Sequence, residues 1–157
     1  MRARDEAEAR LEAWMADHGV PGRMRRFAAS CHTAAEAAAA AGVAVHDIVK
    51  NVCLITEDGR LVVAVARGDH RVSTRRVGRA LGLARPRPAG PDEVLRLTGY
   101  PAGGVPSFGY EALFLVDEAV MERPRVLTGG GSDRALVEIA PADLVAACGA
   151  RIARIRK

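Results

Sequence analysis

The chain has 157 residues, the length of one domain, and we expect residues 1–157 to form a single domain without an internal repeat. A hydrophobic share of 49% supports a core, and with 4% aromatic residues that core is mainly Ala, Val and Leu. No apolar run approaches the roughly 20 residues that span a bilayer, and the charged N-terminal sequence is unlike a signal peptide. We therefore expect a cytoplasmic protein without membrane contact, and a monomer is the default.

The first half of the chain predicts two helices and a β-hairpin. An amphipathic helix opens the chain and stops before a Gly-Val-Pro-Gly sequence at residues 19–22. Thr33 and Glu36 form a capping-box pattern for an alanine-rich helix that Gly42 ends. The other elements expected here are a strand at residues 24–27, a turn at 45–48, and hairpin strands at 49–56 and 61–66.

The second half predicts three more helices between strands. Ser73 can cap a helix over residues 74–81, Pro91 can open one over 92–97, and Pro141 can open a last helix that ends at Gly149. Strands are expected at residues 113–116, 126–127 and 135–139. Because helices and strands interleave but hairpins are present too, we expect an α+β fold. Its curved mixed β-sheet would form a partial barrel flanked by helices, rather than a doubly wound parallel sheet.

Lys50 is the most informative charged residue. Alternate side chains of a strand share a face, so Lys50 lies with Val52 and Leu54, and Asn51 lies with Cys53. Burying an unpaired ammonium is costly. Lys50 therefore either reaches a pocket that holds an anion or carbonyl groups, or extends to water from the end of the strand.

Two glycine-rich stretches are candidates for close contact with a ligand. Residues 99–110 hold four glycines and two prolines, and residues 129–131 are three consecutive glycines between strands. Glycine allows positive φ and close backbone approach, and successive amides can bind an anion or a carboxylate. Neither stretch has the lysine of a P-loop or GxGxxG spacing, which argues against a nucleotide triphosphatase. The alternative for residues 129–131 is a wide hairpin loop.

The histidines and cysteines show no motif for nucleophilic or metal chemistry. Cys31 lies next to His32, but adjacency alone does not make a catalytic dyad. Cys53 and Cys148 fit buried, inert core cysteines. With no CxxC or HExxH spacing, neither a metal nor a cofactor is expected. An enzyme of this sequence would position water and polarise a carbonyl rather than form a covalent intermediate.

Positive charge gathers in the middle and tail of the chain. Residues 60–90 carry eight arginines against one acid, and the tail at 151–157 adds four positive charges. This asymmetry indicates a polyanion partner, and the alternative is a solvated surface in an arginine-rich composition. The candidate contacts to a nucleic-acid backbone are Arg67, Arg71, Arg75, Arg76 and Arg79.

Four stretches, taken in order, resemble one protein family. They are TAAEAAAAAGVAVHDIVKNVCLI, VVAVARGDHRV, LTGYPAGGVPSFGY and VLTGGGSDRALVEIAPADLVAACGA. Together they cover most of the chain, from Thr33 to Ala150, and resemble the YbaK/ProX family. That family includes free-standing aminoacyl-tRNA deacylases and the editing domain of bacterial prolyl-tRNA synthetase, so the resemblance implies the fold of that editing domain.

The resemblance also implies roles for individual residues. The family's lysine, on which deacylation most depends, corresponds to Lys50, and Asn51 follows it in the binding site. The family's GxxxP loop cups the aminoacyl-adenosine end of a mischarged tRNA, and here corresponds to Gly103, Gly104, Val105, Pro106 and Ser107. A further wall of that pocket would be Gly129, Gly130 and Gly131. Two positions depart from the family pattern: Ser107 replaces its final proline, and Asn51 stands where threonine is frequent.

The expected function is trans-editing by ester hydrolysis. The enzyme would deacylate Ala-tRNA(Pro) or another small aminoacyl-tRNA, carrying Cys or Ser, by positioning water with help from the substrate's own free hydroxyl. Its partners would be the acceptor end of the aminoacyl-tRNA and, as a candidate, prolyl-tRNA synthetase. Two alternatives remain open: a non-catalytic tRNA- or synthetase-binding module of the same fold, and a hydrolase of another small aminoacyl or nucleotide ligand.

Overall fold

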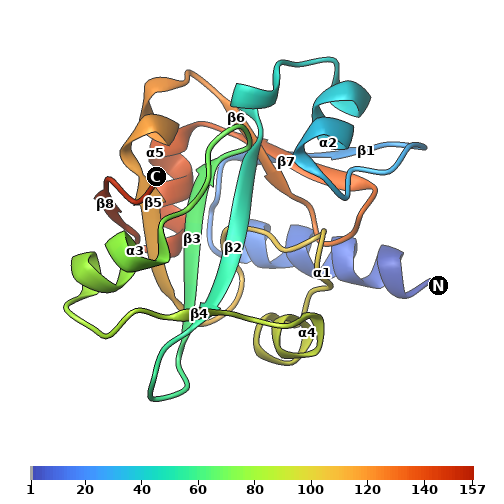
Figure 1. The fold of residues 1–157 in the computed structure, drawn as a ribbon. Helices are drawn as coiled ribbons and strands as arrows, with labels where there is room; N and C mark the ends of the chain where they lie inside the picture. The colour runs from blue at the N-terminus through green and yellow to red at the C-terminus, as the bar shows by residue number, and fades with distance from the viewer. Residues whose placement is uncertain (1) are drawn as a thin grey trace.

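Helices and strands interleave along the chain in the computed structural model, which describes residues 2–157 (Figure 1). The helices are α1 Ala3–Asp17, α2 Ala34–Ala41, α3 Thr74–Leu81, α4 Pro91–Thr98 and α5 Pro141–Cys148, with 3-10 turns η1 Val45–Asp47 and η2 Glu118–Glu122. The strands are β1 Gly22–Arg26, β2 Val49–Ile55, β3 Leu61–Arg67, β4 Arg87–Pro88, β5 Leu113–Asp117, β6 Val126–Gly129, β7 Ala135–Ile139 and β8 Arg151–Ala153. No helix within residues 2–157 is long and apolar enough to cross a membrane.

Local capping signals set the helix boundaries as predicted. The Thr33 side chain accepts a hydrogen bond from the Glu36 amide, and the Glu36 side chain accepts one from the Thr33 amide, so the capping box of α2 is complete. Gly42 ends α2 in the left-handed region, with φ of 69°. Ser73 caps α3 through the amide of Arg76. These signals act within one turn of the chain, which is why the sequence alone reveals them.

The strands form a mixed α+β fold, which confirms the predicted fold class. One sheet has five strands in the order β4-β2-β3-β5-β8, and the other has three in the order β1-β7-β6. β2 and β3 are antiparallel, whereas β3, β5 and β8 are parallel. A parallel bridge between Ile48 and Leu127 connects the two sheets. The expected curved sheet is therefore built as two pieces that meet where β2 begins.

Three short elements are absent from the sequence predictions. β4 and β8 have two and three residues, and η2 is a single short 3-10 segment. The strands β4 and β8 depend on partners that are distant in the sequence: β4 pairs with the end of β2, and β8 pairs with β5. Elements of this length carry no periodic signal of their own.

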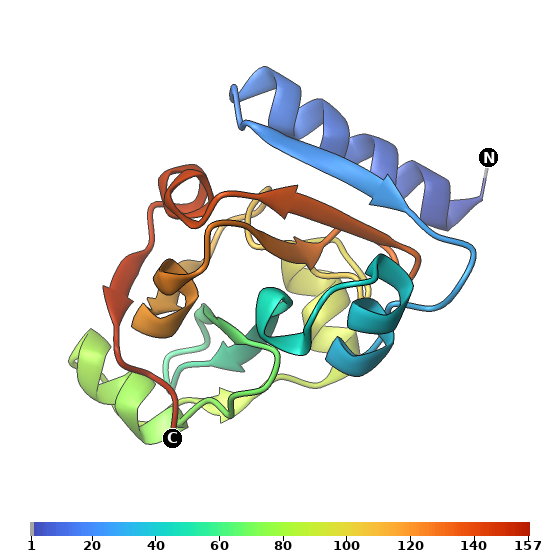
Figure 2. The same cartoon turned by 90° about the horizontal axis from the view of Figure 1, so that it is seen from above.

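Helix α1 runs alongside β1 and closes the core behind the three-stranded sheet (Figure 2). Leu11 and Met15 are buried in the main core cluster with residues of β2, β3, β5 and β7. Trp14 stacks on Phe108 with ring centroids 5.7 Å apart. α1 is therefore a direct support for the loop that contains Phe108.

Candidate active site

The residues that the sequence singles out meet at a cavity of about 330 Å3 beside β2. Lys50, Asn51, Gly103, Val105 and Gly129 all line it. Its other walls come from the segment before α2, from α2 and from the β4–α4 region. Its volume lies at the lower end of the range for small-molecule sites.

The cavity exists because one edge of β2 is only partly paired. At its start β2 is tied to β6 through the Ile48–Leu127 bridge, and at its end it pairs with β4. The carbonyl of Cys53 accepts a hydrogen bond from the amide of Ala89 at 3.0 Å, so its backbone groups point to this edge. In an antiparallel pair alternate residues face the same way, so the backbone of Asn51 also faces this edge, between the two tethers.

Lys50 extends from the face of β2 opposite to the Asn51 side chain. Its neighbours on that face, Val52 and Leu54, pack with α3 in a separate apolar cluster. Partial burial, and then the positive charge of Arg71, lower the pKa of Lys50, while Asp69 acts in the opposite direction. Two cations close enough to influence each other favour an anion between them.

The carbonyls of the glycine loop, residues 99–110, are fixed by hydrogen bonds. The carbonyls of Gly104, Val105 and Pro106 accept hydrogen bonds from Gly131 N at 2.8 Å, Asn51 Nδ2 at 2.8 Å and Tyr110 Oη at 2.6 Å, respectively. Within residues 2–157 the amides of Gly103 and Val105 donate to no protein acceptor. Free amides on a loop whose neighbouring carbonyls are tethered suit a site that receives a ligand's carbonyl oxygen.

Asn51, Ser107 and Thr128 form a closed ring of hydrogen bonds. Asn51 Nδ2 donates to Thr128 Oγ1 at 2.9 Å, and Ser107 Oγ donates to Asn51 Oδ1 at 2.6 Å. Because the Ser107 proton is thereby used, Thr128 must donate across the 2.7 Å contact between the two hydroxyls. The other Asn51 amide proton goes to Val105. All polar atoms of the Asn51 side chain are engaged, so its side chain holds the loop in position.

Residues 129–131 support the glycine loop by backbone contact. A methyl group on Gly129 would lie 2.1 Å from the Val105 oxygen, and one on Gly104 would lie 2.7 Å from backbone atoms of Ser132. Glycine is needed at both positions because the two chain segments touch. The remaining site candidates lie behind the cavity wall and are buried: Gly104, Pro106, Ser107, Gly130 and Gly131.

Sequence reasoning missed two residues at or behind the site, His32 and Glu8. Cys31 and His32 line the cavity, and a methyl group on Gly103, whose φ is 88°, would lie 2.2 Å from His32 Nδ1. Glu8 of α1 is buried, accepting hydrogen bonds from Ser132 Oγ at 2.6 Å and Arg26 Nε at 2.7 Å. The proximity of His32 to the loop is tertiary, and neither residue belongs to a recognisable motif.

The thiols near the core are neutral, as the sequence suggested for Cys53 and Cys148. Burial raises the pKa of both to about 11. Burial, and then the charges of Asp133 and Glu36, also raise the pKa of Cys31. None of these thiols has the lowered pKa of a nucleophilic cysteine.

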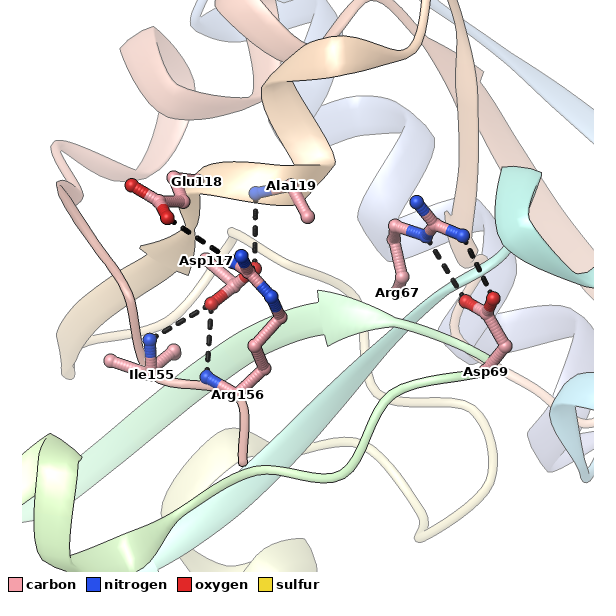
Figure 3. A network of polar contacts seen from close by, with 7 residues as sticks. All are labelled: Arg67, Asp69, Asp117, Glu118, Ala119, Ile155 and Arg156. Atoms are coloured by element: carbon pink, nitrogen blue, oxygen red, sulfur yellow. Dashed lines mark hydrogen bonds and ion pairs between the residues drawn. The ribbon is translucent and has the colours of Figure 1, made fainter.

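The basic segment of the chain folds against the C-terminal tail. Arg67 is paired with Asp69 by two hydrogen bonds of 2.8 and 3.1 Å (Figure 3). The amide of Lys157 donates to the carbonyl of Arg71 at 2.8 Å, and the amide of Ser73 donates to that of Ile155 at 2.7 Å. Exposed basic residues of this segment and of the tail are Arg71, Arg75, Arg79, Arg85, Arg151, Arg154 and Lys157.

A buried carboxylate anchors that tail. Asp117 accepts hydrogen bonds from the amides of Ala119, Ile155 and Arg156 and from the Arg156 guanidinium, at 2.8 to 3.0 Å (Figure 3). Burial alone would raise the pKa of Asp117, but these donors hold it below its ordinary value. The tail thereby keeps a defined position beside the segment that leads into α3.

The family model for the aminoacyl-tRNA editing domain matches residues 28–147. The chain belongs to this family. The match contains all the cavity residues named above and leaves α1 and the C-terminal tail outside.

Individual relatives agree with this assignment. The chain is 31% identical over 130 residues to a proline–tRNA ligase of Geotalea daltonii, matching 82% of this chain but only 22% of the ligase. It is 28% identical over 120 residues to the uncharacterized protein YwhH of Bacillus subtilis, matching 75% and 76% of the two chains. A crystal structure provisionally assigned as a trans-editing enzyme for prolyl-tRNA synthetase superposes with a TM-score of 0.89 at 32% identity, over 96% of this chain and 97% of the other.

Proposed function

We infer that the protein is a trans-editing hydrolase that deacylates mischarged aminoacyl-tRNA, with Ala-tRNA(Pro) the first candidate substrate and Cys- and Ser-tRNA(Pro) next. The observation that carries this proposal is the convergence of Lys50, the free amides of Gly103 and Val105, and the unpaired edge of β2 on one small cavity. Membership of the editing-domain family and the likeness to a prolyl-tRNA synthetase trans-editing structure support it. Such a protein works in the cytoplasm, where aminoacyl-tRNA is used.

We propose a task for each part of the cavity. The amides of Gly103 and Val105 bind the ester carbonyl oxygen and stabilise the negative charge that develops on it when water attacks. Lys50 neutralises the terminal phosphate or holds the ribose end. A free ribose hydroxyl beside the ester protonates the leaving oxygen. The small cavity admits only the aminoacyl-adenosine end, and its size excludes larger side chains, as in double-sieve editing.

The acceptor stem would lie on the basic face. Arg71, Arg75, Arg76 and Arg79 are the contacts we propose, and they bind phosphates without reading sequence. Arg67 contributes less, because Asp69 already neutralises it. The positive charge of Arg71 helps to lower the pKa of Lys50, so positive charge continues from the cavity to this basic segment.

The test is hydrolysis of labelled Ala-, Cys-, Ser- and Pro-tRNA(Pro) by the wild-type protein, beside Lys50→Ala and Arg23→Ala. Arg23 is an exposed residue of β1 away from the cavity and serves as the matched charge control. We expect one small mischarged species to be hydrolysed, with activity lost in Lys50→Ala and kept in Arg23→Ala.

The outcomes separate the alternatives. No hydrolysis of any species, with tRNA binding that weakens steeply as salt rises, would indicate a non-catalytic binding module. Hydrolysis of a free aminoacyl or nucleotide ester at the same rate as the tRNA ester would indicate a small-ligand hydrolase.

A further inference from the structure

We propose that His32 is the proton acceptor of the site, taking a proton from the attacking water. The proposal rests on the proposed hydrolase function and adds a catalytic base to it. It comes from the side chains that line the cavity and from the position of His32 against the glycine loop.

The cavity has no other side chain suited to accept a proton near neutral pH. Among residues 2–157, those lining it include no Asp or Glu. Its two thiols, Cys31 and Cys53, are kept neutral by burial. Lys50 is a cation in its ordinary state, and the role proposed for it needs that charge. An unperturbed imidazole has a pKa of about 6.5 and is mostly neutral at pH 7.5.

His32 is placed where the ester must lie. It follows the buried Cys31, whose amide donates to the Asp133 carbonyl, and it precedes the N-cap of α2, so both sides of the residue are anchored. Its ring lies against Gly103, one of the two residues whose amides are free to bind the ester carbonyl. Neither ring nitrogen takes part in a hydrogen bond with residues 2–157. The side chain is exposed at the cavity and can meet a water molecule.

The step balances with these groups alone. The water oxygen forms a bond to the ester carbonyl carbon as its proton passes to one imidazole nitrogen of His32. The carbon–oxygen bond to the ribose then breaks, and the imidazolium returns its proton to the leaving oxygen, either directly or through the neighbouring ribose hydroxyl, which gives up its own proton and takes the one from the imidazolium. The products are the free amino acid and the tRNA with its terminal hydroxyls restored.

Charged groups of both signs flank the segment that contains His32. Glu36 of α2 and Asp133 are acidic neighbours of this segment, and Arg134 and Lys50 are basic ones. The glycine loop, residues 99–110, has no charged side chain. We expect the activity to fall at acidic pH, because a protonated imidazole cannot act as a base.

The experiment compares wild type with His32→Asn, His32→Gln and His32→Ala in steady-state deacylation of the mischarged tRNA from pH 5.5 to 8. The spontaneous rate is subtracted at each pH. Asn and Gln keep hydrogen-bonding capacity but cannot take a proton, and His46→Asn, in η1 outside the cavity, is the matched control. Circular dichroism checks that each variant is folded.

We expect kcat to fall by about 100-fold or more in all three His32 variants, with little change in KM. The decrease in activity at acidic pH that the wild type shows should be absent from their pH–rate profiles. Added imidazole should restore part of the activity to His32→Ala. A His32→Asn variant that keeps the wild-type rate and the wild-type decrease in activity at acidic pH would overturn the proposal, and the hydrolase function would still stand. A loss confined to KM would make His32 a binding residue and overturn its role as base. Wild-type protein that hydrolyses no ester would overturn both proposals.

Discussion

Replacing Asn51 with alanine tests the role that the hydrogen-bond ring assigns to this residue. Its side chain donates to the Val105 carbonyl and to Thr128, and accepts from Ser107. Ser107 and Thr128 are completely buried, so water cannot replace the missing partner without a rearrangement. Asn51→Ala therefore removes the tether between β2 and the glycine loop and leaves buried polar groups behind.

The magnitude follows from the groups left without a partner. A buried polar group that loses its hydrogen bond costs about 1–3 kcal/mol. The Val105 carbonyl loses its side-chain donor, and the two hydroxyls keep only each other, so we expect a destabilisation of about 3 kcal/mol. In a domain of this size 1 kcal/mol corresponds to roughly 2–4 °C in Tm, so Tm should fall by roughly 10 °C.

The assay is thermal unfolding followed by circular dichroism, with deacylation measured well below the transition. Asn51→Ala should lose activity through kcat as well, because the Val105 amide moves when its carbonyl is released. The matched comparison is Ser107→Ala with Thr128→Val, made alone and together with Asn51→Ala. Groups in one network lose less in combination than the sum of the separate losses. An Asn51→Ala protein that unfolds at the wild-type temperature, or strictly additive losses, would refute the ring.

Three further substitutions test the supports of the site. Gly129→Ala should abolish deacylation and lower stability by about 1–3 kcal/mol, because its methyl group would clash with the Val105 carbonyl; unchanged kinetics would contradict this contact. Glu8→Ala should lower Tm by several degrees, because it leaves the buried Ser132 hydroxyl without its acceptor; thermal unfolding with Glu12→Ala as control measures the effect. Asp117→Asn should be more destabilising at pH 7 than near pH 3, because a carboxylate with a lowered pKa stabilises the fold above its unfolded pKa of about 3.9 and loses that effect as pH falls. Equal urea midpoint shifts at both pH values would count against the Asp117 prediction.

Elements with strong local signals could be predicted from the sequence. α3 and β7 have the predicted bounds, because Ser73 and Gly82 delimit one and a short apolar run defines the other. β6 begins where predicted but extends to Gly129, since a strand can include a glycine when its neighbour supplies the pairing. β4 and β8 escaped prediction because their existence depends on partners distant in the sequence.

The segments that form the candidate site could be predicted from the sequence, but the contacts between them could not. The sequence brings out Lys50 and both glycine stretches, since glycine clusters and a lysine within an apolar strand are visible without coordinates. It does not reveal that Gly129 packs against the glycine loop, or that His32 lies on Gly103. These are contacts between segments far apart in the chain, and no local pattern encodes them.

The two departures from the family pattern are in direct contact, which changes how they should be understood. Taken separately, Ser107 in place of proline leaves a more flexible loop, and Asn51 in place of threonine is a change of shape. In the structure the Ser107 hydroxyl donates to Asn51 Oδ1 at 2.6 Å, and Asn51 in turn holds the carbonyl of Val105. Hydrogen bonds from β2 thus supply the restraint that a proline ring would give through its fixed φ. Because this restraint needs both side chains, the double variant Ser107→Pro with Asn51→Thr should lose less Tm than the sum of the losses of the two single variants, a coupling that a double-mutant cycle on Tm measures.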